Sequence, residues 1–115
     1  MKLLRVGKKG DEKPAILDSN NIIRDLSSNI KDFNSDNLKL ETISKLKKIN
    51  LETLPEIKNS ERIGACVNKP GKFVAIGLNY SDHAKETGLK IPSEPIVFMK
   101  ASSSISGPND DIEMP

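Results

Sequence analysis

The chain of 115 residues is poor in several residue types, and each shortage removes a class of protein. It has one cysteine and one histidine, which excludes an internal disulfide and a cysteine-rich zinc site. Aromatic residues make up only 3%, so a core must be built mainly from Ile, Leu and Val. No apolar run is long enough for a membrane span or a secretory signal, because charges interrupt MKLLRVGKKGDEK at the N-terminus. We therefore expect a cytoplasmic protein with a modest core.

The charges are abundant but balanced. Lys and Arg number 18 against 16 acidic residues, and the net charge of +2 is spread without a long basic stripe. Such a pattern argues against a nucleic-acid partner. The lack of a spanning apolar run argues against a membrane partner.

The first part of the chain has the pattern of a small antiparallel meander. Three short apolar runs, LLRV, PAILD and IIRDL, are separated by segments rich in Gly, Lys, Asp and Asn. GKKGDEK suits the first turn, and residues 18–21 (DSNN) suit the second, because Asn and Asp tolerate left-handed backbone. We expect an α+β, β-rich fold that begins with this meander.

One amphipathic helix is expected after the meander. Leu40, Ile43, Leu46 and Ile49 recur at every third position, with lysines between them. The lysines are interpreted as the solvated face of the helix rather than as an anionic docking site, since no aromatic residue is interleaved with them.

The composition changes near residue 62, which predicts two domains, 1–62 and 63–115. IGACV is expected to be a buried strand in which Cys66 has a structural role, followed by a turn at NKPG (68–71). The apolar runs KFVAIG and PIVFMK predict two further strands. PIVFMK has the composition of a strand buried on both faces, so we expect the second domain to be incomplete within this chain.

GLNYSDHAKE, residues 77–86, contains the single histidine and the single tyrosine. Gly77 predicts a tight exit from the preceding strand, Asn79 a helix N-cap and Gly88 the helix end. His83 and Glu86 are then i and i+3 on one helical face, where a carboxylate can orient an imidazole that acts as a general base. The alternative is a weak, exposed pair without catalytic function.

Several consecutive motifs resemble the fumarylacetoacetate hydrolase family. They are VAIGLNYSDHAKETG, EPIVFMKASSSISGPNDDIEMP and, at the N-terminus, MKLLRVGKKGDEKPAILD. The resemblance is closest to the bacterial branch of ureidoglycolate lyases, 2,4-diketo-3-deoxy-sugar-acid hydrolases and 2-hydroxyhepta-2,4-diene-1,7-dioate isomerases. It implies a β-roll catalytic domain that holds Mg²⁺ or another divalent cation, with His83 and Glu86 activating water.

The resemblance also implies further site residues, and the sequence departs from the family's pattern at two positions. Asn79, Tyr80 and Lys100 are candidates for binding the substrate, although a helix cap, packing and a strand end are equally good roles for them. Leu78 stands where many relatives have Arg, and Ile76 where some have a metal-binding Asp.

The family's metal-binding carboxylates would follow the point where this sequence stops. The acidic residues near its end, Asp110, Asp111 and Glu113, follow a Gly-Pro turn and are expected to form a solvated loop rather than a metal site. We therefore expect no metal bound by this chain, which would then be an inactive N-terminal portion of a longer enzyme.

The function implied for the longer protein is hydrolysis or isomerisation of a 2-keto or 2,4-diketo acid. The expected partners are this small molecule and a second copy of the protein, as a homodimer. Ureidoglycolate lyase activity and a non-enzymatic, truncated or oligomerising module are the alternatives.

Overall fold

The computed structural model describes residues 1–58 and 61–114, which form two compact units. The N-terminal unit comprises Met1–Pro70 and Ile105–Pro115, and the ribbon unit comprises Gly71–Ser104. Strands and short helices occur in both units, so the α+β class is confirmed at that level. The domain boundary near residue 62 and the β-roll stay predictions. Within the described ranges, every helix is too short or too polar to cross a membrane.

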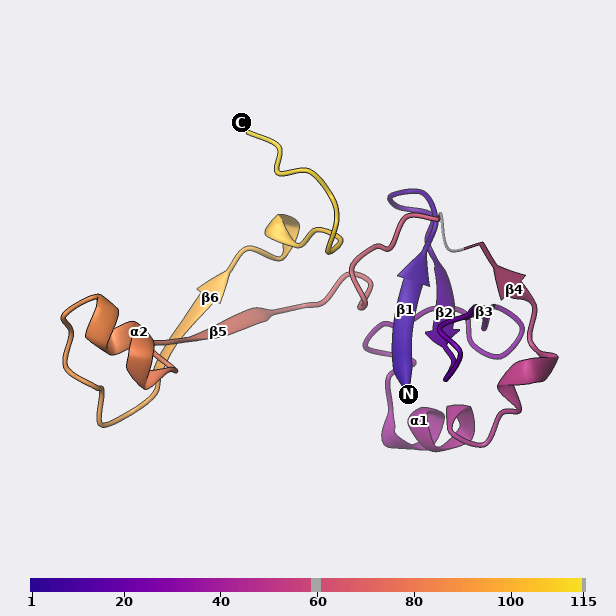
Figure 1. Cartoon of the computed structure of the whole chain (residues 1–115), viewed down its shortest axis with the longest axis horizontal. Coiled ribbons are helices and arrows are strands. Elements are labelled where there is room, and N and C mark those ends of the chain that lie inside the picture. Colours follow the sequence, from indigo (N-terminus) through magenta and orange to yellow (C-terminus); the bar gives the residue numbers. More distant parts are fainter. Residues whose placement is uncertain (59–60, 115) are drawn as a thin grey trace. The chain divides into compact units, whose positions relative to one another are not determined.

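The N-terminal unit is built on a four-stranded antiparallel sheet whose order follows the chain (Figure 1). Its strands are β1 (Lys2–Val6), β2 (Lys13–Leu17), β3 (Ile23–Asp25) and β4 (Glu56–Ile57). The turn between β2 and β3 lies where the sequence predicts it. Asp18 Oδ1 accepts the backbone N–H of Asn20 at 2.8 Å and of Ile22 at 2.9 Å, and Asn21 takes φ 61°.

Both faces of this sheet are covered by apolar side chains. Leu4 pairs with Ala15 and Leu3 with Ile16, so neighbouring positions face opposite sides. One buried cluster contains Val6, Ala15 and Ile23; the other contains Ile16, Leu26, Ile30, Phe33 and Leu46. Leu26, Ile30 and Phe33 come from an irregular segment rather than from a strand or helix, so periodicity does not reveal them.

Helix α1 (Leu40–Leu46) is shorter than the predicted 40–49. Leu46 is 3% exposed, whereas Leu40 is 89% exposed, so the apolar face begins later than the pattern indicates. The last turn tightens through i to i+3 bonds, Lys48 N–H to Lys45 O and Ile49 N–H to Leu46 O. A 3-10 helix, η1 (Leu51–Thr53), follows, and its N-cap Asn50 accepts the N–H of Glu52.

The prediction of a buried strand at IGACV is wrong. Ile63 forms an isolated bridge with Val6, but the chain does not continue as a strand, and Cys66 is exposed. The segment leaves the edge of β1 because the backbone N–H of Asn68 binds the carbonyl of Phe33 at 2.7 Å. Cys66 therefore lies outside the core.

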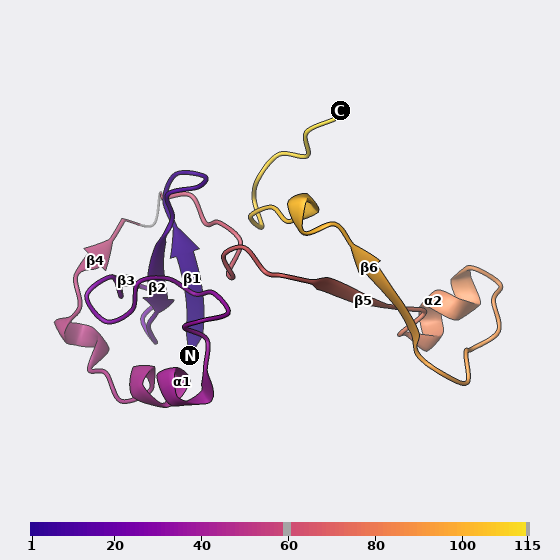
Figure 2. The ribbon, with the colours of Figure 1, turned by 180° about the vertical axis from the view of Figure 1, so that it is seen from behind.

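The ribbon unit consists of β5 (Phe73–Gly77) and β6 (Ile96–Lys100), which pair antiparallel, and a 3-10 helix η2 (Ser102–Ser104). Helix α2 (Ser81–Glu86) lies in the connection between the strands (Figure 2). The burial expected for PIVFMK is not observed, since every residue of β6 is exposed. The physical reason is that, among the described residues, β5 and β6 pair only with each other, and a sheet of two strands buries little surface.

A connected set of polar side chains holds the N-terminal unit together, and we call it the arginine network. Its members are Arg5, Glu12, Asp32, Arg62, Asn68 and Asp110. In its first half, buried Arg5 donates to Asp32 from Nε at 2.6 Å and from Nη2 at 3.1 Å, and its Nη2 lies 3.3 Å from Glu12. Asn68 donates to the same Asp32 carboxylate at 2.6 Å.

Arg62 forms the second half of the network. It donates to Glu12 at 2.8 Å and to both carboxylate oxygens of Asp110, at 2.7 and 2.6 Å. The same Asp110 side chain accepts the backbone N–H of Gly107 at 2.7 Å. Glu12 thus joins the two arginines, and the bidentate geometry is the stronger form of a carboxylate–guanidinium pair.

These contacts lower the pKa values of the carboxylates. Hydrogen bonds from Arg62 lower the pKa of Asp110 from 3.8 to about 2, and they raise the pKa of Arg62. Burial by itself would raise the pKa of Glu12 and of Asp32, but hydrogen bonds from the arginines and from backbone N–H groups outweigh it. All three carboxylates are therefore held in the charged form.

Acid should weaken the N-terminal unit in a defined pH window. Because the folded pKa of Asp110 lies below its unfolded value of 3.8, its contribution is complete above that value and is lost as the pH falls toward 2. The free energy of unfolding in urea, followed by far-ultraviolet circular dichroism, should be nearly constant from about pH 7 to about pH 5 and then decrease. Asp110→Asn should show a smaller decrease. Equal slopes for the two proteins below pH 3.8 would contradict the assignment.

Candidate functional site

The segment before α2 differs from its prediction in two ways. The tight exit from β5 lies at Leu78, with φ 48°, and Gly77 remains within the strand. A left-handed conformation is uncommon for a branched residue such as Leu and implies local strain. The helix N-cap is Tyr80, without a side-chain hydrogen bond, rather than Asn79. The turn at Leu78 delays the helix by one residue, which leaves Asn79 ahead of the cap.

The end of α2 agrees with its prediction. Gly88 takes φ 67°, its N–H binds Lys85 O at 3.1 Å, and the N–H of Leu89 binds Ala84 O at 2.9 Å. These two bonds define a Schellman motif, in which Gly is favoured because it carries no Cβ.

His83 and Glu86 both lie in α2 and are exposed. Their i and i+3 positions put them on the same side of the helix, next to buried Ala84. Across residues 1–58 and 61–114, the structure records no hydrogen bond between these two side chains, so their pairing stays a prediction. The hydroxyl of Thr87 donates to the carbonyl of His83 at 2.8 Å, which supports the last turn.

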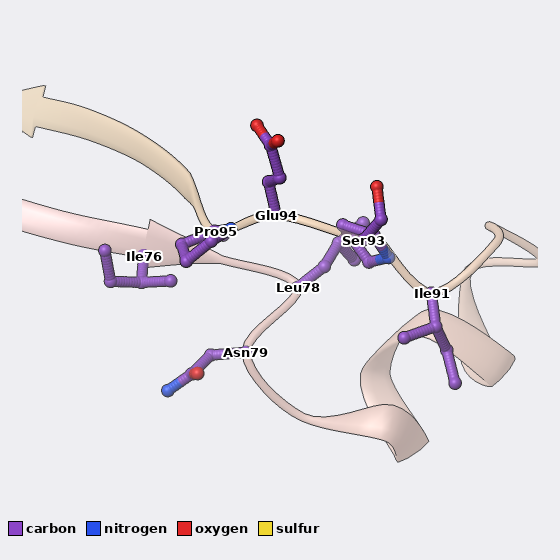
Figure 3. A pocket seen from close by; sticks show the side chains of 9 residues that line it. Ile76, Leu78, Asn79, Ile91, Ser93, Glu94 and Pro95 are labelled. Atoms are coloured by element: carbon purple, nitrogen blue, oxygen red, sulfur yellow. The ribbon is translucent and has the colours of Figure 1, made fainter.

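A pocket of about 280 Å³ lies between the two ends of the connection that joins β5 to β6 (Figure 3). Its walls come from the end of β5 with the turn at Leu78, and from the loop that precedes β6. The lining residues are Ile76, Gly77, Leu78, Asn79, Ile91, Pro92, Ser93, Glu94 and Pro95. In Figure 3 the side chain of Glu94 extends upward and that of Asn79 extends toward the lower left, from the two ends of the connection. The pocket therefore combines an apolar wall with a few oxygen and amide groups.

The pocket includes only part of the predicted site. Asn79 lines it, whereas His83, Glu86, Tyr80 and Lys100 are not among its lining residues. Tyr80 is 74% exposed, and Lys100 ends β6 opposite Phe73.

Sequence reasoning missed the contributions of Ile91, Ser93 and Glu94. Their proximity to Leu78 follows from the antiparallel pairing of β5 with β6, in which Gly77 lies opposite Ile96. KFVAIG and PIVFMK are continuous apolar runs joined by one connection, so an antiparallel pairing of the two strands was the available signal.

The described residues do not fit a divalent cation site. Among them, no three His, Cys, Asp or Glu side chains come together as a set of metal ligands. The expectation that Asp110 lies in a solvated loop is wrong, because its side chain is 16% exposed and binds Arg62. Glu113 instead forms an exposed pair with Lys9 at 3.3 Å. Asp110 thus forms an ion pair, and its carboxylate oxygens bind the guanidinium group of Arg62 rather than a metal ion.

Comparison with known proteins places this geometry in context. Residues 72–115, which include β5, α2 and β6, match the model of the fumarylacetoacetate (FAA) hydrolase C-terminal domain. A Burkholderia ambifaria (strain AMMD) protein named "Putative hydrolase" is 53% identical over all 115 residues. Both findings support the fumarylacetoacetate hydrolase family. The branch within that family stays a prediction.

Two further relatives with the same kind of name come from Burkholderia lata and Burkholderia multivorans. They are 52% and 51% identical to the chain, again over its whole length. In each case the match covers 41% of the relative. The chain thus spans about two-fifths of the length of these relatives.

Gly88 gives a test of the helix that carries His83. Gly88→Ala should destabilise the helix end by roughly 1–2 kcal/mol, because Ala disfavours the left-handed conformation. Amide exchange of Leu89, measured by NMR, should be about tenfold faster. Gly71→Ala is the matched control, since a Cβ meets nothing within 4 Å at either glycine but only Gly88 has a positive φ. Equal exchange in both variants would exclude the Schellman end.

Proposed function

We propose that the protein to which this chain belongs is a fumarylacetoacetate-hydrolase-family enzyme that cleaves a carbon–carbon bond of a 2-keto or 2,4-diketo acid. The observation that carries the proposal is the position of α2. This helix presents His83 and Glu86 to solvent, within the segment that matches the family and directly after a pocket-lining turn. The "Putative hydrolase" names of the relatives support the reaction class.

In the proposed reaction, His83 acts as the general base. Its imidazole takes a proton from water while the water oxygen attacks a carbonyl carbon of the substrate. Glu86 stabilises the imidazolium that forms, as a carboxylate does when it orients a catalytic histidine. The carbon–carbon bond then breaks, its electron pair forms an enolate, and protonation of the enolate releases a keto acid beside a second acid. Isomerisation would involve neither water attack nor cleavage of a carbon–carbon bond: His83 would remove a proton from the substrate to form an enolate, and the proton would be returned to a different carbon.

The cofactor and the oligomeric state belong to the same proposal and rest on the resemblance alone. They are a divalent cation, in the first place Mg²⁺, and a homodimer. Because the described residues lack a suitable ligand set, we assign the cation to no residue of this chain. A cytoplasmic location is likewise proposed from the composition.

Ureidoglycolate lyase activity is a second candidate, favoured by the charge of the pocket. None of its nine lining residues is cationic, and Glu94 is anionic. Leu78 contributes an apolar side chain where an arginine could hold a second substrate carboxylate. A ureido group, which offers N–H donors, would suit the oxygens of Asn79 and Glu94 better.

Substitutions on α2 test the role of His83. In the full-length protein with Mg²⁺, His83→Ala should abolish the loss of ultraviolet absorbance of a 2,4-diketo acid, since general bases contribute about 10²–10⁴-fold. Glu86→Gln should lower kcat less severely. Lys85→Ala, also exposed on α2, is the matched control and should leave turnover unchanged.

The outcomes separate the two parts of the proposal. Normal turnover in His83→Ala would remove the base assignment. No turnover of the diketo acid by the unaltered protein, together with turnover of ureidoglycolate, would select the second candidate.

A further inference from the structure

The arginine network links two segments that are far apart in sequence. Asn68 lies just before the ribbon unit, and Asp110 lies just after it. Between them the contacts run without a break through Asp32, Arg5, Glu12 and Arg62. Every member belongs to the N-terminal unit, so both segments that flank the ribbon are attached to the same body.

Backbone contacts reinforce the first of these segments. The N–H of Gly7 binds Arg62 O, and the N–H of Gly64 binds Arg5 O, both at 2.8 Å. Arg5 also donates to Ala65 O at 3.3 Å. Residues 62–65 are therefore fixed to β1 by bonds that do not involve Asp110.

The second segment, residues 105–110, depends on fewer contacts. Asp110 binds Arg62, and buried Gly107 approaches the carbonyl oxygen of Ile63 so closely that a Cβ would collide with it. The N–H of Gly107 also binds the Asp110 carboxylate. The ion pair of Asp110 with Arg62 and the close packing of Gly107 against Ile63 thus hold the same short segment.

We propose that Arg62, Asp110 and Gly107 form a clamp that returns the chain to the N-terminal unit after the ribbon. The clamp closes residues 71–104, which carry His83 and Glu86, into a loop with both flanks attached to the N-terminal unit. Opening it releases residues 105–114 locally and leaves β1, β2 and β3 folded, because the contacts of these strands lie elsewhere. The clamp concerns the fold and does not depend on the role of His83.

The test is hydrogen–deuterium exchange measured by mass spectrometry on the unaltered chain and on four variants. Asp110→Asn weakens the charge contact, and Gly107→Ala blocks the close approach without changing charge. Glu113→Gln removes a carboxylate from the same segment whose pair with Lys9 is exposed, so it is the control for charge. Gly71→Ala is the control for an added methyl group.

Residues 105–114 should exchange at least tenfold faster in Asp110→Asn and in Gly107→Ala. Exchange of the peptides from β1 to β3 should rise by a clearly smaller factor, which is set by the loss of global stability. The two controls should change neither. Unchanged exchange of residues 105–114 in both clamp variants would overturn the proposal. An equal increase for residues 105–114 and for β1 to β3 would also overturn it, because the segment would then open only through global unfolding and not locally.

Discussion

Arg62 is shared between Glu12 and Asp110, and this sharing connects parts of the N-terminal unit that the sheet alone does not join. Glu12 follows the first turn, and Asp110 comes from residues beyond the ribbon. Removing charges from water is costly unless each finds an opposite charge and further hydrogen bonds. Here each carboxylate has both, and no buried side-chain nitrogen or oxygen in the described ranges lacks a partner. The network therefore tolerates burial that an isolated ion pair would not.

Local patterns in the sequence predict local structure well. Three short apolar runs indicate β1 to β3, the Asp and Asn side chains at residues 18–21 form the expected turn, and Gly88 ends α2. Each of these features is decided by residues within a few positions of one another. The errors arise where distant contacts decide. IGACV has strand-like composition, yet the bond from Asn68 to Phe33 draws the chain away from the sheet.

The arginine network lies beyond such reasoning. Arg62 and Asp110 are 48 positions apart, and Arg62 and Glu12 are 50 apart, so no spacing rule connects them. Balanced charge in the composition suggests solvated surface instead.

The candidate site shows the same difference between local features, which the sequence reveals, and contacts between distant residues, which it does not. The His83–Glu86 spacing is a local feature that sequence reveals, whereas the pocket joins Leu78 to Glu94 through strand pairing, and Leu78 rather than Gly77 takes the left-handed conformation.

The central claim is that the arginine network acts as one unit rather than as separate ion pairs. The most direct measurement is a double-mutant cycle between its two ends, with Asp32→Asn, Asp110→Asn and the double variant unfolded in urea at pH 7. Asp32 and Asp110 share no direct contact but are linked through Arg5, Glu12 and Arg62. We expect the double variant to lose clearly less stability than the sum of the single losses. Additive losses would show that the two arginines work independently and would contradict the claim.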